Sequence, residues 1–262
     1  MYKLFKKSPH PALKPFVKEF WYLYTQHGNP MPMSNTPTPE EALYFYPKNP
    51  PIPLLPDGTK IHSPDNIIIS QSVNRVNMLV PDDYLMYKII FQTGGFYRLF
   101  GIPMTEFSGL IIETFSVLGT PIKELREQIS NATTFEEMVR FSEIYLMKIV
   151  RNFKIEKHPI DLVLNQANLY QFSLDKLASD ACLSNRQFER KFLVRTGVSP
   201  KIYQRIVRFN QVIKLKKENP KQSWLNITYS AGYFDQMHLL RDFRQFTDTN
   251  PTGFDFENAI IY

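Results

Sequence analysis

The chain has 262 residues, of which 43% are hydrophobic, 14% aromatic and 21% charged. This length suits two domains that each bury a core, and the composition is that of a folded globular protein rather than a disordered chain. Nowhere do eighteen apolar residues run together, so we expect no membrane span, and the single cysteine, Cys182, excludes an internal disulfide. These features predict a cytoplasmic protein.

The net charge of +6 is unevenly distributed along the chain. Between residues 168 and 254 there are 14 lysines and arginines against 7 aspartates and glutamates, whereas the rest of the chain carries a net charge of −1. A basic surface that serves nucleic acid is concentrated in one domain, so this segment is the part predicted to attract phosphate. A solvated charged surface explains this charge count equally well. The spacing of the side chains along the predicted helices has to distinguish the two interpretations.

Residues 9–119 are rich in aromatic and β-branched residues and are punctuated by proline and glycine, including Gly94 and Gly95. This texture is typical of short strands joined by turns. Strands are predicted at residues 42–46, 66–70, 76–80 and 85–91, with a turn at 81–83.

Helical patterns replace this texture after residue 119. Thr134 stands three residues before Glu137, a capping box that opens a helix predicted to end near Phe153. A charged segment and a proline follow, which favours a domain boundary there. We therefore expect an α+β protein. Its predicted domains are a β-rich unit with terminal helices at residues 1–157 and an all-α unit at residues 158–262.

The first part of the all-α unit fits a helix-turn-helix. Ser173 can cap one helix and Ser184 the next, where Gln187 completes a capping box. Phe188 and Phe192 lie one turn apart and anchor the inner face of the second helix. Its opposite face carries Arg186, Glu189, Arg190 and Leu193 at i, i+3, i+4 and i+7.

Those polar side chains have the chemistry needed to identify bases. Arginine presents two donors to guanine, glutamate accepts a hydrogen bond from cytosine, and the major groove, roughly 12 Å wide, admits a helix. Taken alone, the same stripe also fits an ordinary amphipathic surface helix.

A long basic helix follows the first unit. Gly197 suits a left-handed helix end, and Ser199 with Pro200 can start a helix that stops before Pro220. About eighteen residues at ~1.5 Å each span ~27 Å, close to the ~34 Å between successive major-groove faces. This helix, with Lys201 in its first turn, is predicted to place two reading units on one duplex.

The second unit repeats the first about fifty residues later. Ser223 can cap its first helix and Asp235 its second. The outward stripe of the second helix carries Gln236, Met237, Leu240, Arg241 and Arg244. Gln236 and Arg241 are the predicted hydrogen-bonding residues, whereas Met237 and Leu240 fit contacts with thymine methyl groups and core positions equally well.

Residues 160–254 resemble the AraC/XylS family of bacterial transcription regulators. The similarity is most specific from Gly232 to Leu239, reading Gly-Tyr-Phe-Asp-Gln-Met-His-Leu, and at Asn250-Pro251. Thr228 and Cys182 depart from the small residues usual in the family. The resemblance implies two helix-turn-helix units on a shared linker helix, with helix amino termini at phosphates. The predicted DNA-binding residues are Ser184, Arg186, Gln187, Glu189, Arg190, Lys201, Asp235, Gln236, Met237, Leu240, Arg241 and Arg244.

The amino-terminal region is similar to a cupin-like domain attached to some regulators of this family. The similarity lies in residues 10–17, Phe20-Trp21-Tyr22 and Pro56-Asp57-Gly58. It implies a small β-barrel that senses a ligand or mediates dimers, with the helix at 134–153 as a dimer element. The implied partners are double-stranded DNA, a small-molecule effector, RNA polymerase if the protein activates transcription, and a second copy of the chain.

Other chemistry has little support in the sequence. The five histidines show no metal-ligand spacing, and no Ser-His-Asp order, Walker loop or dinucleotide fingerprint is present, so we predict no metal, no cofactor and no catalytic residue. A DNA-binding regulator with a sensory β domain is the leading hypothesis. The alternatives are a constitutive DNA-binding protein whose first domain only dimerises and a cupin-type enzyme fused to a DNA-binding module.

Overall fold

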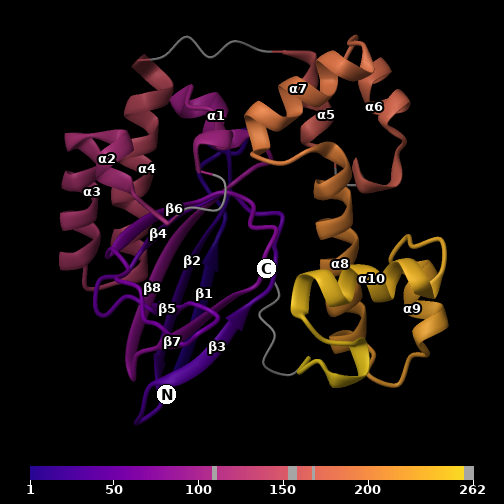
Figure 1. Ribbon diagram of the computed structural model, residues 1–262. Helices are drawn as coiled ribbons and strands as arrows, with labels where there is room; N and C mark the ends of the chain where they lie inside the picture. The colour runs from indigo at the N-terminus through magenta and orange to yellow at the C-terminus, as the bar shows by residue number, and fades with distance from the viewer. Residues whose placement is uncertain (108–110, 153–157, 167–168, 257–262) are drawn as a thin grey trace.

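The structure is a computed structural model that describes residues 1–107, 111–152, 158–166 and 169–256. Its amino-terminal part is rich in sheet and its carboxy-terminal part is helical (Figure 1). The α+β class predicted from the sequence is therefore confirmed. The predicted linker at 154–157 and the predicted helix end at Phe153 lie outside the described residues.

Two antiparallel sheets make up the β-rich part. The six-stranded sheet has the order β1 (Tyr2–Lys7), β2 (Val17–Gln26), β8 (Asp83–Phe91), β4 (Ala42–Phe45), β6 (Asn66–Ile69) and β9 (Ile112–Glu113). The three-stranded sheet has the order β3 (Met31–Asn35), β7 (Val76–Val80) and β5 (Ile52–Leu54). The four strands predicted from the sequence are present within one or two residues of their expected ends.

Strand β8 separates two cores because its side chains alternate between the faces of the sheet. Tyr84 and Met86 contribute to the cluster between the two sheets, whereas Tyr87 and Ile89 face the cluster under the helices. The helices of the β-rich part are α1 (Gly95–Phe100), α2 (Thr114–Leu118), α3 (Thr120–Asn131) and α4 (Phe135–Asn152), with a short turn η1 (Met104–Phe107). Figure 1 shows α3 and α4 against the outer face of the larger sheet.

One expectation for the β-rich region was wrong. The texture of residues 9–119 predicts strands and turns, but α1 and α2 interrupt it. Gly94 precedes α1 with a φ of 73°, a left-handed conformation that glycine adopts without a steric penalty. Gly95 packs so closely on Phe16 that a Cβ would lie 2.2 Å from the Phe16 carbonyl oxygen. The glycine pair therefore starts a helix against the preceding chain instead of marking a turn between strands.

The carboxy-terminal part consists of two helix-turn-helix units at the two ends of one long helix (Figure 1). Its elements are α5 (Pro159–Leu164), η2 (Leu169–Gln171), α6 (Leu174–Asp180), α7 (Asn185–Thr196), α8 (Pro200–Glu218), α9 (Trp224–Ser230), α10 (Gln236–Thr247) and η3 (Pro251–Gly253). Each unit has its own hydrophobic core. Phe188 and Phe192 are fully buried in the first, as are Phe243 and Phe246 in the second.

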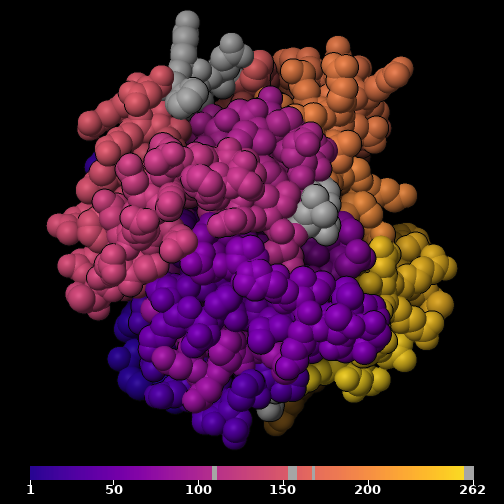
Figure 2. All heavy atoms as spheres, turned by 60° about the vertical axis from the view of Figure 1, so that its left-hand side comes forward, coloured from indigo at the N-terminus to yellow at the C-terminus, as the bar shows by residue number. Residues whose placement is uncertain are grey.

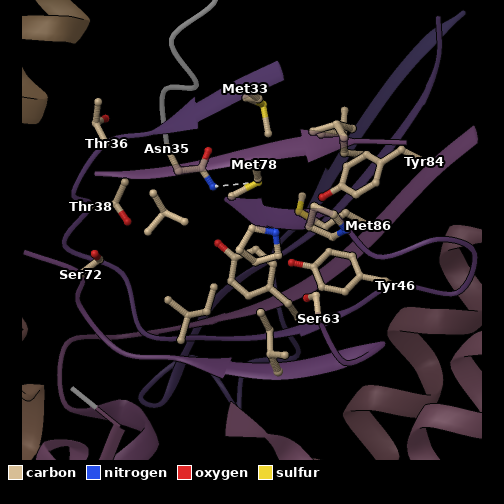
Figure 3. Close-up of a pocket in the computed structure, with 18 of the residues that line it drawn as sticks. Met33, Asn35, Thr36, Thr38, Tyr46, Ser63, Ser72, Met78, Tyr84 and Met86 are labelled. Atoms are coloured by element: carbon tan, nitrogen blue, oxygen red, sulfur yellow. Dashed lines mark hydrogen bonds between the residues drawn. The ribbon is translucent and has the colours of Figure 1, made fainter. Parts of the chain in front are cut away.

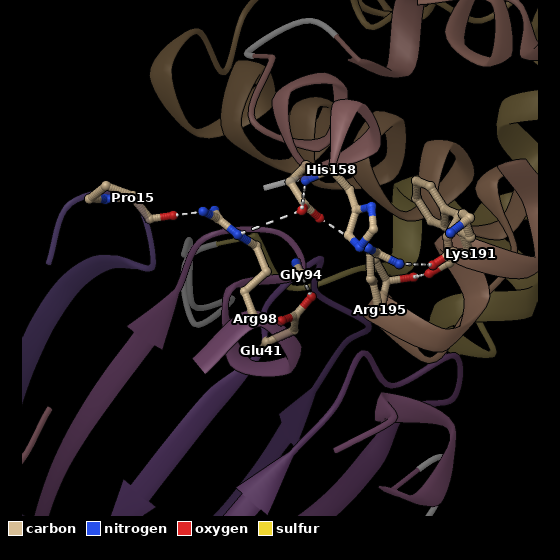
Figure 4. Close-up of polar contacts among 10 residues, drawn as sticks. Pro15, Glu41, Gly94, Arg98, His158, Lys191 and Arg195 are labelled. Carbon is tan, nitrogen blue, oxygen red and sulfur yellow. Dashed lines mark hydrogen bonds and ion pairs between the residues drawn. The ribbon is translucent and has the colours of Figure 1, made fainter. Parts of the chain in front are cut away.

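A polar junction attaches the first unit to the β-rich part (Figure 4). Asp161 of α5 accepts a hydrogen bond from Nε of Arg195 on α7 at 2.7 Å and lies 3.9 Å from Nε of Arg98 on α1. Arg98 also donates to the Pro15 carbonyl at 2.8 Å. Because Asp161 and Arg195 are almost completely buried, these contacts fix the orientation of α7 relative to α1.

Separate contacts hold the second unit, which rests against the side of the β-rich part in Figure 2. Arg75 donates to the carbonyl of Thr247, which ends α10, at 2.8 Å. Asn210 of α8 donates to the Pro37 carbonyl at 2.8 Å. The β-rich part thus contacts both units.

Candidate DNA-binding surface and internal pocket

The second helix of the first unit, α7, begins at the predicted capping box. Ser184 accepts from the backbone N–H of Gln187 at 3.4 Å, and the Gln187 side chain accepts from the backbone N–H of Ser184 at 3.1 Å. Gly197 closes the helix with a φ of 81°. Ser184 and Gln187 therefore set where α7 starts, and both remain exposed at that end.

One face of α7 is open to solvent. We call Arg186, Glu189, Arg190 and Leu193 the first reading stripe. All four are exposed, whereas Phe188 and Phe192 on the opposite face are fully buried. Ser184, Arg186, Gln187 and Arg190 line one shallow hollow at the start of the helix. The structure therefore brings the predicted residues of the first unit together on a single exposed surface.

The corresponding helix of the second unit, α10, is capped by Asp235. Its carboxylate accepts from the backbone N–H of His238 at 2.8 Å and contacts Nδ1 of the same residue at 2.9 Å. The hydrogen bond from the His238 N–H lowers the pKa of Asp235. Asp235 therefore sets where α10 begins, and its contact with DNA stays a prediction.

The outward face of α10 is more apolar than that of α7. Gln236, Met237, Leu240, Arg241 and Arg244 form the second reading stripe. Met237 is 59% exposed and Leu240 is half-buried, so neither is a core residue. Gln236 and Arg241 are exposed, whereas Nε of Arg244 donates to Asn250 at 3.0 Å. Arg244 is thus partly engaged at the far end of α10.

The basic residues in the first half of α8 divide into two groups. Lys201 is exposed in the first turn, beside the first unit. Arg205 forms a 2.6 Å ion pair with Asp242 of α10, and Arg208 lies over the ring of Tyr233 at 5.5 Å. The last two therefore join α8 to the second unit, and only part of the positive charge counted in the sequence is available to phosphate.

Phe234 is an exposed residue that the sequence analysis did not select. It immediately precedes Asp235, is 85% exposed, and places its ring edge-on to His238 with centroids 6.3 Å apart. The neighbouring Tyr233 is buried and donates to Asp242 at 3.0 Å. The sequence does not indicate which of the two adjacent aromatic residues, Tyr233 or Phe234, points outward, because the residues of a turn follow no regular periodicity of burial.

A pocket of about 740 Å³ lies between the two sheets of the β-rich part (Figure 3). Its walls carry methionine and aromatic side chains from both sheets, including Met33, Met78, Met86, Tyr46 and Tyr84. The lining also includes Lys217, which comes from α8. This volume falls within the range of roughly 300–1,000 Å³ typical of small-molecule sites.

No metal site or membrane span emerges from the described part of the chain. Residues 1–107, 111–152, 158–166 and 169–256 contain no group of three or more His, Cys, Asp or Glu side chains placed to hold a metal ion. None of the helices in the same ranges is long and apolar enough to cross a bilayer.

Two family matches cover most of the chain. Residues 177–255 match the family described as helix-turn-helix domain, of the AraC type, and residues 6–113 match a domain of unknown function, DUF6597. No curated protein matches the chain. Matches to solved structures include ToxT from Vibrio cholerae at 1.65 Å resolution, with 11% identity, a TM-score of 0.45 and coverage of 99% of this chain and 98% of that one. Unsaturated fatty acid bound ToxT from strain SCE256 has 12% identity, a TM-score of 0.44 and coverage of 88% and 93%.

Proposed function

Since residues 177–255 form an AraC-type helix-turn-helix domain, we propose that the protein is a sequence-specific transcription regulator that binds double-stranded DNA through α7 and α10. The observation that carries this proposal is the pair of exposed reading stripes on capped helices at the two ends of α8. The stripe on α7 carries groups that hydrogen-bond to bases, and Lys201 stands beside it for phosphate. We place the protein in the bacterial cytoplasm, where such a regulator meets its DNA.

Binding-site selection from random duplexes tests this proposal. We expect one preferred sequence to emerge and the affinity for it to fall steeply with salt, because lysine and arginine contacts release counterions from DNA. Equal affinity for the selected and scrambled duplexes would reject sequence-specific recognition. No binding at low salt would reject the DNA-binding proposal as a whole.

We also propose that a small molecule in the pocket controls DNA binding. Lys217 supports this because it belongs to α8 and yet lines a cavity of the β-rich part. An occupant can therefore touch both the barrel-like sheets and the helix that joins the two units. The expected result is that an effector shifts affinity for the selected duplex. If no molecule that binds in the pocket changes the affinity for DNA, the protein would instead be a constitutive DNA-binding protein.

Dimerisation through α4 is a further part of the proposed function. Ile144 is 50% exposed on α4, while Met138 and Leu146 on its inner face are buried. Replacing Ile144 with Asp should leave a monomer if this helix joins two copies, as measured by sedimentation.

The same protein sample tests the enzyme alternative, because stoichiometric bound metal would favour a cupin-type enzyme. Contact with RNA polymerase belongs to the proposal only if the protein activates transcription.

A further inference from the structure

Two short segments of the β-rich part line the same side of the pocket. We call residues 36–38, between β3 and β4, and residues 72–75, between β6 and β7, the wall segments. Figure 3 shows Thr36, Thr38 and Ser72 along one side of the pocket, and all three are half-buried, so a molecule in the pocket can reach them. An occupant of the pocket therefore meets both wall segments.

The residues next to these side chains contact the carboxy-terminal part. The carbonyl of Pro37 accepts a hydrogen bond from Nδ2 of Asn210 on α8 at 2.8 Å. Val73 packs against the hydrophobic cores of both helix-turn-helix units. Nη1 of Arg75 donates to the carbonyl of Thr247, the last residue of α10, at 2.8 Å. Each wall segment therefore touches the pocket with some of its residues and the carboxy-terminal part with others.

Arg75 connects the end of α10 to the smaller sheet. Its Nη2 donates to Oγ of Ser34 on β3 at 2.8 Å, while its Nη1 holds the Thr247 carbonyl. That carbonyl lies at the carboxy-terminal end of α10, where the helix dipole is negative and a cation is favoured. A displacement of residues 72–75 therefore displaces the end of α10 as well.

The first unit is anchored by a junction that lies outside the pocket lining. Asp161 and Arg195 hold α7 against α1, and neither residue lines the pocket. Lys217 lines the pocket from the last turn of α8, a part of the helix that packs on the second unit. A molecule in the pocket therefore contacts the supports of the second unit without contacting the polar junction of the first.

We propose that the wall segments transmit occupancy of the pocket to the orientation of the second unit, with Val73 and Arg75 as the positioning residues. This assignment rests on the proposed function, in which a small molecule in the pocket controls DNA binding. An occupant changes DNA affinity only if it contacts the two orientations of the molecule differently. The wall segments meet this requirement, because a displacement that makes room for the occupant changes the contacts of Val73 and Arg75.

The test attaches a stand-in occupant inside the pocket of the full chain. Cys182→Gly removes the natural thiol, and Met33→Cys introduces one in the pocket lining, on β3. Methyl or hexyl methanethiosulfonate then forms a disulfide with this thiol and releases methanesulfinate. The hexyl label should change the dissociation constant for the selected duplex at least about fivefold relative to the methyl label. With Glu127→Cys, exposed on α3, the two labels should give equal dissociation constants.

Further variants identify the positioning residues. Combining Val73→Ala with Arg75→Ala should bring the ratio of the hexyl to the methyl dissociation constant to about one, because the wall then lacks its contacts with the units. Arg75→Lys keeps the charge and should retain part of the ratio. Arg126→Ala is the matched control, because Arg126 pairs with Asp65 at 3.3 Å within the β-rich part, and it should leave the ratio unchanged.

Each ratio is taken within one variant, so a change in basal DNA affinity cancels. Thermal melting establishes that each variant folds, and Arg75→Ala alone provides the same comparison if the double variant does not fold.

The outcomes separate this inference from the proposed function. Absence of a preferred duplex in the unlabelled parent would reject the proposed function and this inference with it. A preferred duplex whose affinity the hexyl label leaves unchanged would reject transmission from the pocket and retain DNA binding. An undiminished ratio in the variants of Val73 and Arg75 would overturn their role and leave Lys217 as the route from the pocket to α8.

Discussion

Cys182 occupies a left-handed backbone conformation. The equivalent position in the second unit is a glycine, Gly232. The φ of Cys182 is 54°, while Gly232 at the same place in the second turn has a φ of 80°. Both residues follow a buried alanine, Ala181 or Ala231. Cys182 is exposed. Its conformation, rather than packing, is therefore the local constraint in this turn.

Replacing Cys182 with Gly should stabilise the protein. A left-handed conformation costs a residue with a Cβ roughly 1–2 kcal/mol, and the flexibility of glycine in the unfolded chain offsets about 0.5–1 kcal/mol of that. We expect a net gain of up to about 1.5 kcal/mol in the free energy of unfolding, measured with urea. Gly232→Ala, which introduces the same strain, should lose stability. A loss in Cys182→Gly would show that the thiol makes a contribution that outweighs the strain.

The arginines of the two reading stripes should affect sequence preference and Lys201 should not. Arg190→Ala and Arg241→Ala are each expected to weaken binding to the selected duplex by about 1–3 kcal/mol and to relax the preference at one base pair. Lys201→Ala should weaken all duplexes alike and reduce the salt dependence. Titrations against the selected duplex and single-base variants measure both effects. Uniform losses for all three variants would identify the arginines as phosphate contacts.

At the scale of the elements, α5 contacts both α1 and α7 through the carboxylate of Asp161. Asp161 on α5 holds Arg195 at 2.7 Å, and both side chains are about 95% buried. His158 adds its backbone N–H to the same carboxylate at 3.1 Å. Arg195 also lies over the Tyr97 ring at 4.9 Å. The end of α7 is thus attached to α1 both through the Asp161 carboxylate and through the contact of Arg195 with Tyr97.

Asp161→Asn should destabilise the protein by about 3–5 kcal/mol, because it leaves the buried Arg195 guanidinium without its counter-charge. Unfolding in urea measures the loss. Asp180→Asn is the matched control: Asp180 pairs with Lys176 at 2.6 Å on the exposed side of α6, where such pairs contribute about 0–1 kcal/mol. Similar losses in both variants would mean that burial of the Asp161 pair has no special consequence.

The helices of the carboxy-terminal part follow from local sequence, and their ends could be predicted. Ser173, Ser184, Ser199, Ser223 and Asp235 all cap helices as expected, because capping depends on residues three apart in the chain. The exposure of the first reading stripe follows from the same periodicity.

Features that depend on distant residues could not be predicted in this way. Strand β1 is exposed along its whole length, so it lacks the alternation that reveals a half-buried strand. Arg195 and Arg190 look alike in the sequence, and only Asp161, far from both in the chain, distinguishes the buried one. The pocket is formed by strands as distant as β3 and β8, whose relative positions the sequence pattern does not specify.

For the whole molecule, the β-rich part restrains both units without covering their reading stripes. The first unit is held through Arg195 and the second through the Thr247 carbonyl, which lie at the ends of α7 and α10. Arg190 and Arg241 remain exposed. Within the proposed function, control of DNA binding would therefore act through the relative orientation of the two units rather than by masking them.

Glu41 is a buried acid at the junction on which that orientation depends. It accepts from the backbone N–H of Gly94 at 2.7 Å, and Gly94 in turn packs against Arg195 (Figure 4). Tyr203 of α8 also faces this site and donates or accepts a hydrogen bond with Thr93 at 2.9 Å. Burial raises the pKa of Glu41 from 4.5 to about 8. At neutral pH the folded protein therefore keeps a proton on Glu41 that the unfolded chain releases.

This difference makes stability fall as the pH rises. Below pH 4.5 Glu41 is protonated in both the folded and the unfolded state, so its full contribution to the free energy of unfolding is present. Between pH 4.5 and about 8 the folded state binds one more proton than the unfolded state. Over this range the free energy of unfolding decreases by up to about 1.4 kcal/mol per pH unit. Above about pH 8 the loss levels off. Glu41→Gln removes the titration and keeps the shape of the side chain. Its free energy of unfolding, relative to the parent, should therefore rise between pH 5.5 and 8.5. Other titrating groups affect both proteins alike, so parallel pH profiles would mean that Glu41 is already ionised at the junction.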